Sequence, residues 1–96
     1  MITVYHNPNF IELTFKQDIA VRVKEHLDIL QEVAKVDTDD LNKAFRLTNH
    51  IDTDWMDNYE VTPVNGNEHR STSVGDCMEK DGQLYVVAPV GFEEIK

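Results

Sequence analysis

Residues 38–55 constrain the fold most, because their apolar side chains recur at helical spacing. The apolar positions are Leu41, Ala44, Phe45, Thr48 and Ile51. This spacing predicts an amphipathic helix that buries one face. Asp37, Thr38 and Asp39 precede the apolar positions, and we expect their side-chain oxygens to accept N–H groups of the first turn. Asp40 adds negative charge at the positive end of the helix dipole.

Charge limits what the chain can bind. The sequence has 96 residues, with 18 acidic and 9 basic side chains and a formal net charge of -9. This length predicts a single domain over residues 1–96, and a hydrophobic fraction of 41% is sufficient for one core. The negative charge argues against direct binding to nucleic acid or to an anionic membrane. It allows binding to a protein partner with a basic surface.

Cysteine use and hydropathy predict a cytoplasmic protein. Cys77 is the only cysteine, which excludes an internal disulfide and suits a reducing compartment. No apolar run is long enough to span a bilayer, and the first residues lack the blocks of a signal peptide. We therefore expect no membrane association.

The remaining elements are mainly strands. Residues 2–6 alternate between apolar and polar side chains and predict a strand, and residues 61–64 predict a short extended piece. Residues 73–79 and 83–88 predict the two arms of a hairpin that turns at Asp81 and Gly82. Together with the helix they predict an α+β fold, in which one principal amphipathic helix packs on a small antiparallel sheet that ends in a C-terminal hairpin.

Residues 10–36 fit both a helix and strands. Ile19, Val23 and Leu27 lie on one helical face and Asp18 is a plausible cap, yet β-branched residues also alternate here. Our interpretation is a helix or irregular segment to about Asp28, followed by a strand over residues 30–36. Residues 10–15 suit either a short strand or a loop.

Two phrases are similar to a group of small proteins encoded by bacteriophages, plasmids and other mobile elements of bacteria. They are FRLTNHIDTDW at residues 45–55, and RSTSVGD at 70–76 with YVVAPVGFEEI at 85–95. The match covers roughly the last two-thirds of the chain. Cys77 stands where the group pattern has an aliphatic residue. The resemblance implies a phage or mobile-element context, in which small acidic proteins often bind and disable host machinery. It carries over no catalytic residue.

Candidate sites for chemistry are incomplete. His50, Asp52 and Asp54 resemble part of a metal site, but the glycine and glutamate of a calcium loop are missing. Ser71, Ser73 and Cys77 are candidate nucleophiles beside His69, but none lies in a nucleophile elbow. Val74-Gly75-Asp76 is not a glycine-rich phosphate loop, and Gly75 is better explained by a backbone bend. We therefore expect neither a catalytic residue nor a cofactor or metal.

The predicted function is non-enzymatic binding to a host or phage macromolecule, for example inhibition of a nucleic-acid-handling or defence protein by DNA mimicry. Aromatic side chains surrounded by acidic residues are typical of a site that binds a basic protein partner. The predicted partner-binding residues are Asp39, Asp40, Asp52, Asp54, Trp55, Asp57 and Tyr59. One alternative is a small metal- or ligand-binding enzyme that uses His50, Asp52 and Asp54. Another is an assembly protein that forms a homodimer through a sheet edge.

Overall fold

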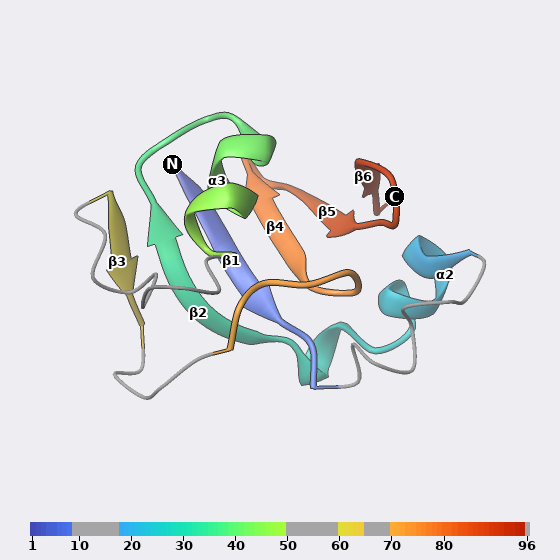
Figure 1. The fold of residues 1–96 in the computed structure, drawn as a ribbon. Helices are drawn as coiled ribbons and strands as arrows, with labels where there is room; N and C mark the ends of the chain where they lie inside the picture. The colour runs from blue at the N-terminus through green and yellow to red at the C-terminus, as the bar shows by residue number, and fades with distance from the viewer. Residues whose placement is uncertain (9–17, 50–59, 65–69, 96) are drawn as a thin grey trace.

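The computed structural model describes residues 1–8, 18–49, 60–64 and 70–95, and these residues form a six-stranded antiparallel sheet with two short α-helices (Figure 1). The elements are β1 (Ile2–His6), α2 (Ile19–Lys24), a 3₁₀ turn η1 (Leu27–Ile29), β2 (Gln31–Val36), α3 (Leu41–Leu47), β3 (Val61–Pro63), β4 (Cys77–Lys80), β5 (Gln83–Val87) and β6 (Phe92–Glu94). The strand order across the sheet is β3-β2-β1-β4-β5-β6. The predicted α+β class is confirmed.

The centre of the sheet is formed by β1, at the N-terminal end of the chain, and by β4. β1 pairs with β2 on one side and with β4 on the other, both antiparallel. The side chains of β1 alternate in burial as its sequence predicted. Ile2 and Val4 are completely buried, whereas Thr3 and Tyr5 are half-buried. The short extended piece predicted at residues 61–64 is β3, which pairs with β2 at the sheet edge.

The predicted hairpin is formed by β4 and β5, but its first arm begins at Cys77 and not at residue 73, because residues 74 and 75 form a turn. Lys80 pairs with Gln83, and the two residues between them, Asp81 and Gly82, have φ of 52° and 82°. Positive φ at both positions is the backbone of a type I′ turn, whose twist matches that of the flanking strands. The structure adds β6, which the sequence did not predict as a strand. It returns antiparallel to β5 and forms the second edge of the sheet.

The segment that fitted both a helix and strands contains both. α2 is a short helix, η1 follows it, and β2 begins one residue later than predicted. Asp18 occupies the position before α2, but the cap prediction is wrong. Its backbone is left-handed, with φ 56°, and its side chain accepts no capping hydrogen bond.

The principal helix is shorter than its apolar pattern suggested. α3 begins after Asp40 and ends at Leu47. At Thr48 the backbone leaves the helix, with φ -110° and ψ 9°, and the Thr48 hydroxyl donates to the Ala44 carbonyl at 2.8 Å. The buried residue Thr48 is therefore the C-cap of the helix. Ile51, the last position of the predicted apolar pattern, lies outside the described residues.

Two hydrophobic cores lie on opposite faces of the sheet, since neighbouring residues along β1 and β4 belong to different cores. Ile2, Val4 and Met78 face α3, which contributes Ala44 to the first core. Cys77 and Val86 face α2, which contributes its buried side chains to the second core. Figure 1 shows α3 lying over β1 and α2 beside the C-terminal strands.

Phe45 is only half-buried, although its helical position suggested a fully buried ring. It packs on the first core and meets Phe92 edge-to-face, with ring centroids 6.4 Å apart. We therefore expect Phe45→Ala to lower the free energy of unfolding by about 2 kcal/mol, less than for a fully buried ring. Urea denaturation measures this. Arg46→Ala, at the exposed neighbour, is the control, and an equal effect of the two variants would contradict the packing.

Candidate functional site

Only part of the predicted partner-binding set lies within the described residues. Asp39 and Asp40 lie in the connection between β2 and α3, and both are exposed. The other five members lie outside the described residues, namely Asp52, Asp54, Trp55, Asp57 and Tyr59. His50, proposed as a metal ligand with Asp52 and Asp54, also lies outside them. The geometry therefore concerns the first two acids and the residues around them.

Asp40 is the N-cap of α3. Its carboxylate accepts hydrogen bonds from the backbone N–H groups of Asn42 at 2.9 Å and Lys43 at 3.5 Å. Our prediction that residues 37–39 cap the helix was therefore wrong, because Asp40 is the residue that caps it. Thr38 supports this turn by accepting a hydrogen bond from the Asp40 N–H group at 3.2 Å.

Asp39 binds the amino group of Met1 at 2.8 Å. The hydrogen bond from this amino group, together with its positive charge, lowers the pKa of the Asp39 carboxyl below its usual value. Asp39 and Asp40 thus both have partners within the chain. These partners compensate part of the charge of the two carboxylates, which are both exposed.

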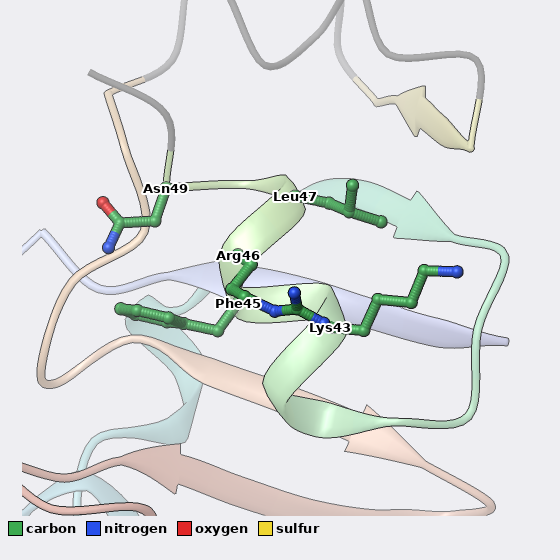
Figure 2. A pocket seen from close by; sticks show the side chains of 5 residues that line it. All are labelled: Lys43, Phe45, Arg46, Leu47 and Asn49. Carbon is green, nitrogen blue, oxygen red and sulfur yellow. The ribbon is translucent and has the colours of Figure 1, made fainter. Parts of the chain in front are cut away.

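The outer side of α3 carries cations instead. Lys43 pairs with Glu60 at 2.9 Å, and Arg46 is exposed. A hollow of about 380 Å³ is lined by Lys43, Phe45, Arg46, Leu47 and Asn49 (Figure 2). Lys43 and Leu47 point to one side of the helix and Phe45 to the other, with Arg46 between them (Figure 2). The surface of α3 itself is therefore partly basic.

The phrase RSTSVGD contains an ion pair between the half-buried Arg70 and the completely buried Asp76. Arg70 donates two hydrogen bonds to Asp76, each 2.6 Å long, so that the guanidinium and carboxylate form a bidentate pair. Asp76 is completely buried, and its carboxylate also accepts the backbone N–H groups of Asn7 and Ser73, each at 2.7 Å. Four donors therefore compensate the burial of this one charge.

The Arg70–Asp76 pair joins the loop before β4 to the end of β1. Arg70 also donates to the carbonyls of Ser71 at 3.0 Å and Asn7 at 3.1 Å. The Asn7 side chain donates to the Gly75 carbonyl at 3.2 Å, where Gly75 has φ 95°. Our prediction that Gly75 provides an unusual backbone angle is confirmed. The glycine and the paired Arg70 and Asp76 thus make RSTSVGD a structural clamp.

His6 and Thr72 extend the clamp without forming a catalytic triad. The His6 Nε2 atom lies 3.1 Å from the Thr72 hydroxyl and 4.0 Å from the Asp76 carboxylate. A triad needs the acid on the other ring nitrogen of the histidine, so that it orients the base toward the nucleophile. Thr72 is also completely buried, out of reach of a substrate. The sequence did not single out Arg70 or Thr72, although the opposite charges at the two ends of RSTSVGD were a visible signal.

Cys77 lies in β4, as predicted, and its side chain is completely buried. Burial, followed by the charge of Asp76, raises the pKa of the Cys77 thiol to about 12. The thiolate is the reactive form. We therefore expect the folded protein to react with a thiol reagent at pH 8 at least about a hundredfold more slowly than the urea-unfolded chain. Equal rates would contradict this burial.

Two further findings concern ligands and membranes. Within residues 1–8, 18–49, 60–64 and 70–95, no three His, Cys, Asp or Glu side chains are placed to hold a metal ion together. In the same part of the chain, no helix has the length and apolar character needed to cross a membrane.

Comparisons with protein-family models, with curated proteins and with solved structures find no significant match to this chain. Function must therefore be argued from the described residues themselves.

Proposed function

We propose that this protein is a non-enzymatic binding protein of phage or mobile-element type, and that it acts on a protein partner with a basic surface. The observation that carries the proposal is a set of exposed carboxylates that lie in no ion pair with another described residue. Its members are Asp18, Glu25, Asp28, Asp37, Glu79, Asp81, Glu93 and Glu94. Uncompensated charges of one sign attract a partner of opposite charge and accelerate association.

Among the described residues, three groups suited to chemistry have structural roles in the fold. Asp76 is surrounded by donors, Thr72 is buried beside His6, and burial raises the pKa of Cys77. Their roles in holding the loop and the core support binding rather than catalysis.

The partner class that we favour is a nucleic-acid-handling or defence protein of the host, because such proteins carry basic grooves that attract negative charge. A binding protein that occupies this groove would inhibit its partner by excluding the nucleic acid.

The test is affinity capture from a bacterial host, followed by measurement of the dissociation constant of the identified partner. We expect the affinity to fall by about tenfold or more between about 0.05 and about 0.5 M salt, because salt screens exposed charges. We also expect double-stranded DNA to compete with this protein for its partner. Salt-independent binding without competition by DNA would overturn the proposal.

A further inference from the structure

The two edges of the sheet differ in their capacity to accept another strand. β3, at one edge, contains Pro63, which has no N–H group to donate. β6, at the other edge, consists of Phe92, Glu93 and Glu94, each with an N–H group. No described strand pairs with the outer side of β6. An edge with free backbone groups is a template for an added strand.

Hydrogen bonds with β5 define which groups of β6 face outward. The N–H group of Ala88 donates to Gly91 at 3.0 Å, and that of Ile95 donates to Leu84 at 2.9 Å. Hydrogen-bonded pairs alternate along an antiparallel ladder, so Glu93 faces Val86 in the intervening hydrogen-bonded pair. The N–H and C=O groups of Phe92 and Glu94 therefore point toward the open edge.

The edge is held in position at both ends. Phe92 packs on the first core, where its ring meets Phe45. Ile95, just after β6, is buried in the second core, and its carbonyl accepts a hydrogen bond from the Gln83 side chain at 2.8 Å. An incoming strand would therefore meet an ordered edge, which reduces the entropy cost of binding.

The negative charges of β6 determine which kind of strand can pair with its outer side. The side chains of Glu93 and Glu94 are both exposed, and neither has an ion-pair partner among the described residues. If two copies paired antiparallel around Glu93, the two Glu93 carboxylates would face each other, which is unfavourable. Lysine or arginine at the facing positions of a different chain would instead form favourable cross-strand pairs.

We propose that the open edge of β6 binds an extended, lysine- or arginine-bearing segment of the partner as a seventh strand of the sheet. This inference rests on the proposed function and identifies the surface that performs it. The backbone groups of Phe92 and Glu94 hold the added strand, and the Glu93 and Glu94 carboxylates select its basic side chains. Val90, which is 91% exposed in the turn before β6, offers an apolar contact beside the edge.

The experiment uses the whole protein, labelled with ¹⁵N, and a short capped peptide with two consecutive lysines between valines as the probe, because adjacent lysines of a strand can face Glu93 and Glu94 on the two faces of the sheet. We expect saturable shifts of the Phe92 and Glu94 amide signals and slower hydrogen exchange at these amides. The same peptide with two glutamates in place of the lysines should cause no saturable shift. If the lysine peptide shifted the amide signals of residues 37–40 instead, or caused no saturable shift, the edge site would be overturned.

Variants separate the backbone contribution from the charge contribution. Glu94→Pro removes an outward N–H group without removing a hydrogen bond to β5, and we expect it to weaken peptide binding by about fivefold to tenfold. The double variant Glu93→Gln with Glu94→Gln keeps the backbone, and we expect about twofold to fivefold weaker binding with a smaller salt dependence. Val21→Ala, on the exposed side of α2, changes neither the β6 edge nor a carboxylate, so it is the control and should leave peptide binding unchanged.

The two proposals fail in distinguishable ways. Circular dichroism and the ¹⁵N spectrum show whether each variant folds, and the double glutamine variant tests the edge even if Glu94→Pro unfolds the protein. If a captured partner binds folded edge variants as tightly as the original protein, the edge site is overturned while the proposed function stands. If partner binding is independent of salt and unaffected by DNA, the proposed function itself fails.

Discussion

Asp76→Ala is expected to lower the free energy of unfolding by about 3–5 kcal/mol. The substitution removes a completely buried carboxylate and leaves the Arg70 guanidinium without its bidentate partner. It also leaves the backbone N–H groups of Asn7 and Ser73 without their acceptor. A loss of this size is a large fraction of the stability of a small domain. Urea denaturation followed by circular dichroism measures the change.

Two further variants test this explanation. Asp28→Ala removes an exposed carboxylate and should change stability by less than about 0.5 kcal/mol. Asp76→Asn keeps the shape of the side chain but removes the charge, so we expect a large loss from this variant too. If Asp76→Ala cost less than about 1 kcal/mol, the buried pair would not hold the loop to β1.

Met78→Ala is expected to destabilise the protein by about 2–5 kcal/mol. Met78 is completely buried in the first core, on β4, where it lies between Val4 of β1 and Tyr85 of β5. Truncation removes apolar contacts and leaves a cavity that the surrounding strands can fill only partly. Thermal and urea unfolding measure the loss.

The matched control for Met78→Ala is a truncation at the surface. Val21 on α2 is 57% exposed, so Val21→Ala should change stability by less than about 0.5 kcal/mol. Equal effects of the two truncations would show that Met78 is not part of a close-packed core.

Sequence periodicity predicted the elements whose pattern arises from burial on one face. β1 and the β4–β5 hairpin were predicted because side chains alternate in strands and because Asp81-Gly82 suits a turn with positive φ. β2 departs from alternation. The pairing of β1 with β2 shifts in register between Val4 and Tyr5 of β1. On β2, the adjacent residues Val33 and Ala34 both lie in the first core. An extra residue in a β-bulge produces this arrangement, and it depends on the neighbouring strand.

The site was less predictable than the fold. The acids chosen from the sequence as a partner-binding set include Asp39 and Asp40, which bind the Met1 amino group and the first turn of α3. Glu93 and Glu94 are exposed and have no ion-pair partner among the described residues, but they were not part of this set because no pattern marked β6 as a strand. Their backbone is extended because it pairs with β5, a contact across the turn at residues 88–91.

The sequence alone determined the α+β class, the first strand, the hairpin turn and the acidic charge, because these follow from local periodicity, turn chemistry and composition. Only the tertiary structure decided that Arg70 and Asp76 form a clamp with Asn7, and that β6 is an edge strand of the sheet that the described residues form. The physical reason is that both features depend on pairing between chain segments. Arg70 and Asn7 are 63 residues apart, and no local pattern records which distant backbone groups will supply the partners of a buried charge.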